Sequence, residues 1–240
     1  MNPRGVRLAL FDLDDTLYDH SHARDHCLLA LRQRFPLLAR RPLAELGRRY
    51  DDILNRIHDH VLDGRMTAGQ ARRARLKELL AGEGLSPGGE EFDEACRLWV
   101  ETYQDSQRAV PGSRVLLESL LALDIRVGIV TNGLTEVQQA KVETCGLADL
   151  VDPVLSSEAA GRRKPDPGIF ELALRQAGVP ADAAVMVGDS WANDVLGARG
   201  AGVRPVWLNR DRRTVPEPGL AAELDSLEPA EQARSVILGR

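Results

Sequence analysis

Four short segments of this chain carry side chains that could do chemistry on a phosphate ester. They are, in chain order, Asp12 with Asp14, Thr131 with Asn132, Lys164, and Asp189 with Asp194. Each segment alone has an ordinary explanation, because Asp and Asn favour turns and helix caps. Together they supply carboxylates, a hydroxyl group and a cation, which is the set of groups that phosphoryl transfer requires.

Crowded carboxylates are the central feature of this set. They repel one another and raise each other's pKa unless a cation neutralises them. Mg²⁺ is the natural cation, because it prefers oxygen ligands and binds through one or two carboxylates together with phosphate oxygens. One carboxylate could then attack phosphorus to form an aspartyl-phosphate. A second carboxyl group could protonate the leaving oxygen and later accept a proton from water.

The rarity of lysine in this chain draws attention to Lys164. Lysine and arginine together number 31, but the lysines are only Lys77, Lys141 and Lys164. Lys164 directly follows Arg162 and Arg163, where the composition favours a third arginine. A lysine presents a compact point charge that fits where the planar fork of an arginine would not. We therefore expect Lys164 to bind phosphoryl oxygens rather than to lie in a solvated basic loop.

The elements that must position these residues are a set of short strands. Buried strands are predicted by nearly continuous apolar runs at residues 6–11, 125–130, 183–187 and 205–208, and by a weaker run at 151–155. Helices are predicted between them by apolar residues at helical spacing, at residues 113–123, 134–145 and 167–177. The expected fold class is α/β, with a parallel sheet covered on both faces. Ligands bind beyond the carboxyl ends of such strands, so the four segments would meet at one site.

Residues 19–108 break the alternation of strands and helices. Their pattern contains no convincing strand and predicts helices at about 21–34, 42–62, 67–82 and 90–106. We interpret this segment as a second, all-helical domain inserted after the first strand. The α/β domain would then comprise residues 1–18 and 109–240.

Composition excludes several classes of protein. The chain has 240 residues, a formal net charge of −5 and 43% hydrophobic residues, which is typical of a globular protein and unfavourable for binding nucleic acid or anionic membranes. Its apolar runs are too short to cross a bilayer. The three cysteines are far apart, so neither a disulfide framework nor a zinc site is indicated. We expect a cytoplasmic protein, monomeric or homodimeric, whose partner is a small phosphorylated metabolite.

The four segments, taken in order, resemble the motifs of the haloacid dehalogenase superfamily. The matching residues are Asp12-Leu13-Asp14-Asp15-Thr16, Thr131-Asn132-Gly133, Lys164-Pro165 and Gly188-Asp189-Ser190 with Asp194. The resemblance extends over essentially the whole chain, and the combination of motifs is far more specific than any one of them. It implies a Rossmannoid parallel-sheet core with an inserted helical cap of the C1 type.

The resemblance also implies a role for each acidic residue. Asp12 would be the nucleophile and Asp14 the general acid and base. Mg²⁺ would bind to the Asp12 carboxylate, the Asp14 backbone carbonyl and Asp189. Asp194 would lie behind these ligands and orient a metal-bound water or Lys164.

Substrate binding is implied by the same resemblance. Thr131 and Lys164 would hold the phosphoryl oxygens, with Asn132 nearby. The segments at 129–133, 138–139 and 207–209 most resemble the branch that contains pyrimidine 5′-nucleotidases and acylneuraminate-9-phosphatases. A nucleoside monophosphate is therefore the expected substrate, with a sugar phosphate or another small phosphorylated metabolite as the alternative.

Other activities fit the sequence less well. A 2-haloacid dehalogenase displaces halide, so it needs no protonated leaving oxygen. Such enzymes typically lack the second aspartate of the first motif, which is present here as Asp14. Phosphonate cleavage would require a cap lysine, and Lys77 lies in an Arg-rich helix that favours a surface role. A receiver-type signalling module would be about half this length and would place its acidic pair ahead of the phosphorylated aspartate. A non-catalytic binding protein would not need the complete set of reactive side chains.

Overall fold

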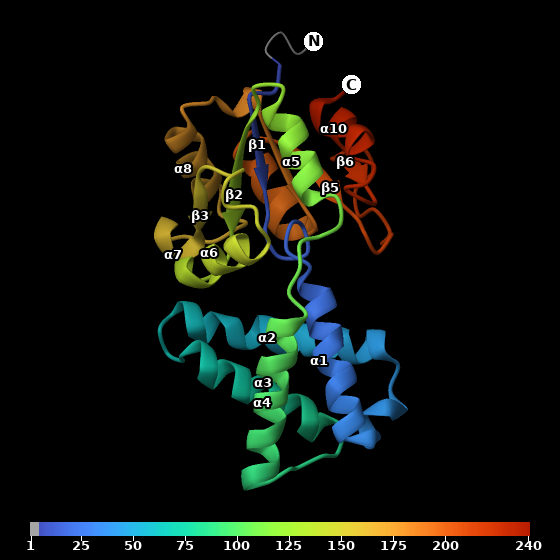
Figure 1. Cartoon of the computed structure of the whole chain (residues 1–240). Helices are drawn as coiled ribbons and strands as arrows, with labels where there is room; N and C mark the ends of the chain where they lie inside the picture. The colour runs from blue at the N-terminus through green and yellow to red at the C-terminus, as the bar shows by residue number, and fades with distance from the viewer. Residues whose placement is uncertain (1–4) are drawn as a thin grey trace. The chain divides into compact units, whose positions relative to one another are not determined.

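The computed structural model describes residues 5–240 (Figure 1). The chain divides into two compact units, which we describe separately. The first unit comprises the chain up to Asp19 together with Arg108–Arg240, and the second unit comprises His20–Gln107. Within the described residues, the helices are too short or too polar to span a membrane.

The first unit is built on a six-stranded sheet in which every pair of neighbouring strands is parallel. The strand order is β3-β2-β1-β4-β5-β6. The strands are β1 Leu8–Phe11, β2 Arg126–Thr131, β3 Val154–Ser156, β4 Ala184–Gly188, β5 Arg204–Leu208 and β6 Ala222–Leu224. This arrangement confirms the predicted α/β class with a parallel sheet. The sixth strand was not predicted, because only Leu224 of its three residues is buried.

The centre of the sheet contains the point at which the strand order reverses. Phe11, the last residue of β1, pairs with Ile129 of β2 on one side and with Val187 of β4 on the other. The chain fills the β2–β3 side first and the β4–β6 side afterwards, so the reversal lies between β1 and β4. The crevice beyond the carboxyl ends of two such strands is where open α/β sheets bind ligands.

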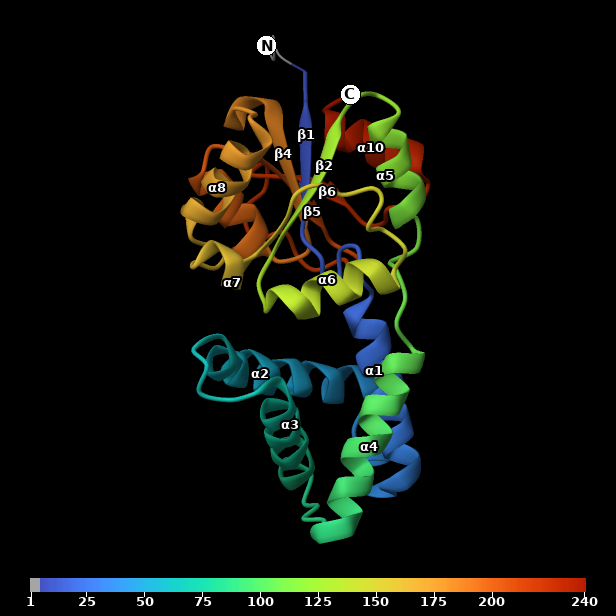
Figure 2. The same cartoon turned by 60° about the vertical axis from the view of Figure 1, so that its left-hand side comes forward.

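Helices cover both faces of this sheet (Figure 2). The helices of this unit are α5 Ser113–Leu121, α6 Thr135–Thr144, α7 Ser157–Ala160, α8 Pro167–Ala177, α9 Gly197–Gly200 and α10 Ala230–Leu238, with a π-helical turn at Trp191–Leu196. In Figure 2, α8 lies on one side of the sheet, and α5 and α10 lie on the other. Asp166 caps α8 by accepting a hydrogen bond from Gly168 N at 2.8 Å, followed by a proline at the first helical position. Fully buried Leu10, Met186 and Phe170 belong to the core between sheet and α8.

The second unit consists of helices, and its described residues contain no strand. The helices are α1 His20–Arg34, α2 Leu43–Leu62, α3 Ala68–Gly82 and α4 Gly89–Asp105, with a 3-10 turn at Pro36–Arg40. Their common core includes Tyr50, whose ring stacks on Trp99 with 4.6 Å between centroids. A capping box formed by Thr67 and Gln70 begins α3.

Candidate active site

The first acidic motif is held by the turn that follows β1. Asp12 N donates to Val187 O of β4 at 2.9 Å, so the strand pairing still fixes the backbone at Asp12. The chain then turns sharply, and the Leu13 carbonyl accepts hydrogen bonds from Leu17 N at 2.9 Å and Tyr18 N at 2.8 Å. This compact turn places Asp12 at the carboxyl end of β1 and directs Asp14 away from the strand.

Lys164 lies between two of the predicted acidic residues. Its Nζ is 2.6 Å from Asp12 Oδ1 and 2.6 Å from Asp194 Oδ1. All three side chains are nearly excluded from solvent, with Lys164 3%, Asp12 8% and Asp194 1% exposed. Burial alone would lower the pKa of Lys164, but the charges of Asp12 and Asp194 outweigh it and raise the pKa above its ordinary value. Lys164 is therefore a permanent cation beside Asp12.

Asp194 reaches this lysine because of the chain geometry after β4. Its Oδ2 accepts a hydrogen bond from Ser190 N at 3.0 Å, which leaves Oδ1 for Lys164. Gly188 makes room for this carboxylate, since a Cβ atom at that position would lie 2.3 Å from Asp194 Cγ. The glycine is required here by close approach of a side chain rather than by backbone conformation.

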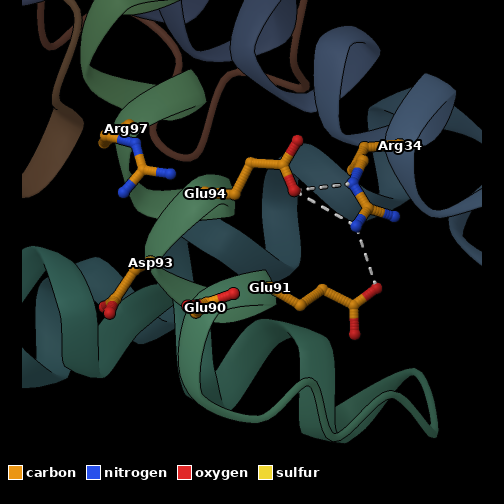
Figure 3. Close-up of a pocket in the computed structure, with 6 residues that line it drawn as sticks. All are labelled: Arg34, Glu90, Glu91, Asp93, Glu94 and Arg97. Atoms are coloured by element: carbon orange, nitrogen blue, oxygen red, sulfur yellow. Dashed lines mark hydrogen bonds and ion pairs between the residues drawn. The ribbon is translucent and has the colours of Figure 1, made fainter.

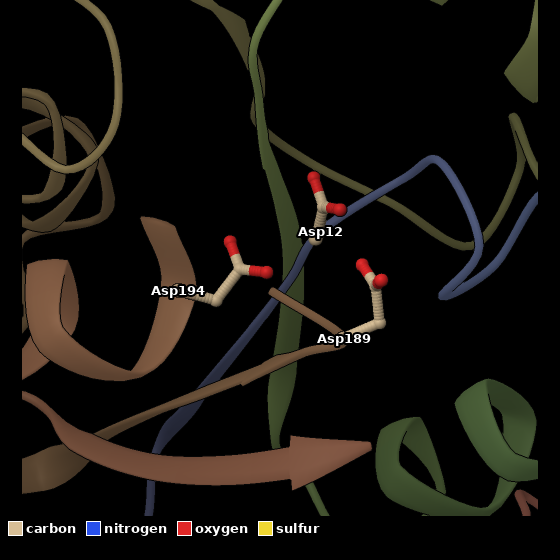
Figure 4. Close-up of side chains that lie close together, drawn as sticks. All are labelled: Asp12, Asp189 and Asp194. Atoms are coloured by element: carbon tan, nitrogen blue, oxygen red, sulfur yellow. The ribbon is translucent and has the colours of Figure 1, made fainter. Parts of the chain in front are cut away.

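Three carboxylates gather at the carboxyl ends of β1 and β4. One ligand atom from each of Asp12, Asp189 and Asp194 lies within 4.8 Å of the others (Figure 4). Burial raises the pKa of Asp12 to about 7, although the charge of Lys164 acts in the opposite direction. Burial, and then the charges of Asp12 and Asp194, raise the pKa of Asp189 well above its ordinary range. Asp12 and Asp194 share Lys164, and Asp189 lies 3.9 Å from the half-exposed Arg213. Three acids therefore face two cations, and this excess of carboxylate oxygens fits a divalent cation.

Thr131 and Asn132 lie at the end of β2 but face different partners. The buried Thr131 Oγ1 accepts a hydrogen bond from Gln138 Nε2 at 2.6 Å, so its own proton remains available to a phosphoryl oxygen. The Asn132 amide instead binds the backbone of Lys164, accepting from Lys164 N at 2.8 Å and donating to Lys164 O at 3.1 Å. Asn132 thus positions the lysine, and its contact with substrate stays a prediction.

Asp14 is not part of the three-carboxylate cluster. Its carboxylate binds Lys141 Nζ, at 2.6 Å through Oδ1 and 2.8 Å through Oδ2. Gln138 Nε2 donates to the same carboxylate at 3.2 Å. The nearby Thr16 is fully buried, and its Oγ1 has no hydrogen-bond partner among the residues described.

Sequence reasoning missed three residues of this arrangement: Gln138, Lys141 and Gly188. The rarity of lysine, which singled out Lys164, applied equally to Lys141 and could have identified it. Gly188 stands inside a recognised motif, but its steric role depends on where Asp194 lies in space. Gln138 lies in a segment that carried the family resemblance, but nothing in residue type or spacing indicated that it links Asp14 to Thr131.

A hollow on the helical unit differs in character from the three-carboxylate cluster. It is lined by Arg34, Glu90, Glu91, Asp93, Glu94 and Arg97 (Figure 3). Arg34 is shared between Glu91 and Glu94, at 3.2 Å from each. These ion pairs are exposed, so they contribute little to the free energy of unfolding. They do not indicate a buried reactive group.

Comparison with known proteins shows which family this chain is similar to. A family model described as haloacid dehalogenase-like hydrolase matches residues 6–202. The pyrimidine 5′-nucleotidase YjjG of Escherichia coli is 31% identical over 225 residues, covering 92% of this chain and 95% of that protein. A glyceraldehyde 3-phosphate phosphatase of Pyrococcus abyssi is 31% identical over 219 residues, covering 85% of this chain and 81% of that protein.

A solved structure shares the fold over nearly the whole chain. The putative HAD-hydrolase YfnB of Bacillus subtilis, crystallised with magnesium, superposes with a TM-score of 0.70. The two chains are 25% identical, and the match covers 97% of this chain and 100% of the other.

Proposed function

This chain belongs to the haloacid dehalogenase-like hydrolase family, and from that premise we propose that it is a Mg²⁺-dependent phosphatase acting through an aspartyl-phosphate on a small phosphomonoester. The observation that carries the proposal is the position of Lys164, 2.6 Å from both Asp12 and Asp194. A carboxylate held against a buried, permanent cation is a nucleophile that can approach an anionic ester. Relatives that are phosphatases support the same reaction class.

The chemistry requires two displacements at phosphorus. In the first, an Asp12 oxygen attacks phosphorus, the bond to the leaving oxygen breaks, and the Asp14 carboxyl group donates its proton to that oxygen. In the second, water attacks the phosphoryl group and gives a proton to Asp14, while the bond to Asp12 breaks and phosphate leaves. Lys164 and the Thr131 hydroxyl hold the phosphoryl oxygens throughout.

The metal ion would be held by the Asp12 and Asp189 carboxylates together with the Asp14 backbone carbonyl. When bound, Mg²⁺ neutralises the carboxylates and draws phosphate oxygens toward the nucleophile. The excess of clustered acids, two of them buried, over the neighbouring Lys164 and Arg213 supports this assignment. The related YfnB crystal structure contains magnesium, which supports the same ion here. Asp194, already bonded to Lys164 and Ser190 N, would fix the lysine rather than ligate the ion.

We assign a nucleoside monophosphate as the substrate, with a sugar phosphate or another small metabolite as the alternative. The similarity to a pyrimidine 5′-nucleotidase over nearly the full chain supports the first. The similarity to glyceraldehyde 3-phosphate phosphatase supports the second. The presence of Asp14 favours both over halide displacement, since a halide leaves without a proton.

Phosphate release from a panel of esters tests the proposal. Initial rates are measured with nucleoside monophosphates, triose and pentose phosphates and p-nitrophenyl phosphate, with 2-chloropropionate as the dehalogenation control. We expect Mg²⁺ to support phosphate release, excess EDTA to abolish it and added Mg²⁺ to restore it.

The outcomes of this panel test the metal ion, the reaction and the substrate separately. Full activity in EDTA would contradict the metal assignment, and halide release without phosphate release would contradict the reaction. A fastest rate on a sugar phosphate would replace the nucleotide by the alternative substrate.

A further inference from the structure

Helix α6 presents two side chains that the proposed reaction does not yet use. Lys141 Nζ contacts both carboxylate oxygens of Asp14, at 2.6 and 2.8 Å. Gln138, one helical turn earlier, uses a single amide nitrogen to reach Asp14 Oδ2 at 3.2 Å and Thr131 Oγ1 at 2.6 Å. One face of α6 therefore connects the expected acid–base residue with an expected phosphate-binding hydroxyl.

This arrangement is built into the fold rather than formed by an exposed surface pair. The Lys141 side chain is 14% exposed, against 34% for Asp14. The ring of Tyr18 lies 5.2 Å from the Lys141 ammonium, a distance at which its face attracts a cation. Gly133 leaves space for Gln138, since a Cβ atom there would lie 3.1 Å from Gln138 Cδ. Because a mostly buried ammonium group is costly without a partner, Lys141 and Asp14 hold each other in place.

We propose that Lys141 is the positioning residue for Asp14, assisted by Gln138, and that it fixes the carboxyl group at the place where protons are exchanged with the leaving oxygen and with water. This inference rests on the proposed phosphatase reaction. Lys141 itself forms and breaks no bond and keeps its proton. When Asp14 gives its proton to the leaving oxygen, the adjacent Lys141 ammonium group stabilises the carboxylate that forms. In the second displacement, Asp14 takes a proton from the attacking water.

Leaving-group chemistry distinguishes this role from a structural one. An alkyl phosphate needs a proton on its leaving oxygen, whereas 2,4-dinitrophenolate leaves without one. The first displacement on 2,4-dinitrophenyl phosphate should therefore not depend on how well Asp14 is positioned. Its second displacement should depend on Asp14, because water must still lose a proton.

The experiment compares Lys141→Met and Lys141→Arg with the wild type. For the fastest alkyl ester of the panel, we expect Lys141→Met to lower kcat by about 10- to 100-fold, with KM nearly unchanged. With 2,4-dinitrophenyl phosphate in rapid mixing, we expect a first-turnover burst at the wild-type rate followed by a slowed steady state. Lys141→Arg should recover much of the loss, since a guanidinium group can also bind both carboxylate oxygens. Lys77→Met, an exposed lysine of α3, is the matched control and should leave both rates unchanged.

Two kinetic results would overturn the inference. An equal loss in the burst and in the alkyl ester rate would show that Lys141 only maintains the structure. Unchanged rates in Lys141→Met would show that Asp14 needs no such partner.

A failure of the proposed function is recognised separately. In that case the wild type would hydrolyse neither ester. A crystal structure of Lys141→Met then decides the positioning role by itself. Displacement of the Asp14 carboxylate, with Asp12 and Lys164 unmoved, supports it, and an unmoved Asp14 contradicts it.

Discussion

Two aspartates that lie two residues apart in the first motif have opposite surroundings. Asp12 is nearly buried and faces Lys164 together with Asp189 and Asp194. Asp14 is one-third exposed and lies against Lys141. Environment of this kind is what separates a nucleophile from a proton-transfer group when both are carboxyl groups. The assignment of Asp12 and Asp14 to different steps therefore has a physical basis in the turn that follows β1.

Exchanging each carboxyl group for an amide should separate the two steps. We expect Asp12→Asn to abolish turnover, because a neutral amide cannot displace the leaving group. Asp14→Asn should slow turnover of an alkyl ester by on the order of 10²–10⁴. With 2,4-dinitrophenyl phosphate, whose leaving group needs no proton, it should accumulate phosphoenzyme, since attack by Asp12 remains possible while water activation is impaired. Steady-state kinetics and mass spectrometry of the acid-quenched protein measure both effects.

The position of the phosphoryl adduct decides this prediction. Peptide mapping should find it on Asp12, and an adduct on another residue would refute the assignment of the nucleophile. Asp182→Asn, an exposed aspartate of the same unit, is the control and should behave as the wild type.

The loop after β4 can adopt its conformation only because Gly188 has no Cβ atom. Gly188 ends the strand, and the following π-helical turn brings Asp194 back over it. We expect Gly188→Ala to displace the Asp194 carboxylate, because the new Cβ would lie 2.3 Å from its Cγ and Oδ2. Overpacking of this kind costs roughly 1–3 kcal/mol of the free energy of unfolding. Lys164 would lose a hydrogen-bond partner, so kcat should fall as well.

Denaturant unfolding and steady-state kinetics check the Gly188 prediction. The matched control is Gly69→Ala at an exposed position of helix α3, where a Cβ atom would meet only Thr67 Oγ1 at 3.9 Å. That change should not lower stability. A Gly188→Ala protein as stable and as active as the wild type would contradict the steric argument.

Elements with a strong local pattern could be predicted from the sequence. The apolar run that ends in Phe11 and the one that ends in Val187 both became central strands. The four predicted helices of residues 19–108 all occur, with ends within one residue or two. The helix predicted at residues 167–177 is α8, and both of its ends lie where they were predicted. In each case the information lay within one continuous stretch of the sequence.

Features that depend on tertiary contacts could not be predicted in the same way. Strand β6 has one buried residue and leaves almost no hydrophobic signal. The π-helical turn at Trp191–Leu196 is a change in hydrogen-bond register that residue types do not specify. The Asn132 amide could have faced a ligand, but it binds the backbone of Lys164, 32 residues further along the chain. The candidate site was therefore predictable as a set of residues and not as a network of contacts.

The chain crosses twice between the two units, and the two crossing segments are hydrogen-bonded to each other at the first unit. Tyr18 and Ala109 form an antiparallel bridge. Val110 N donates to Leu17 O at 2.8 Å, and Asp19 N donates to Arg108 O at 3.0 Å. The two crossing segments thus form a short two-stranded ribbon, which fixes the end of the turn that follows β1 wherever the helices of the second unit lie.

The Asp19 carboxylate secures this ribbon. It is 1% exposed and accepts hydrogen bonds from Arg108 at 2.7 and 2.9 Å and from Arg210, in the loop after β5, at 3.0 Å. Burial opposes ionisation, but the hydrogen bonds and charges of these two arginines outweigh it and hold the pKa of Asp19 below its ordinary value. A group whose pKa is lower in the folded protein stabilises it above the unfolded pKa, and this stabilisation is lost as the pH falls through the folded pKa.

Asp19→Asn should therefore destabilise the protein at neutral pH and much less in acid. We expect a loss of about 2 kcal/mol in the free energy of unfolding at pH 7, because the arginines lose charge-assisted partners but remain solvated. The difference from the wild type should shrink as the pH falls below the pKa that Asp19 has in the unfolded chain, and it should vanish once the pH is below the lowered pKa of the folded protein. Urea unfolding at several pH values measures this difference. Asp225→Asn removes the exposed pair with Arg212 and should change stability little at any pH. A difference between wild type and Asp19→Asn that stays constant with pH would show that Asp19 acts through packing and not through its charge.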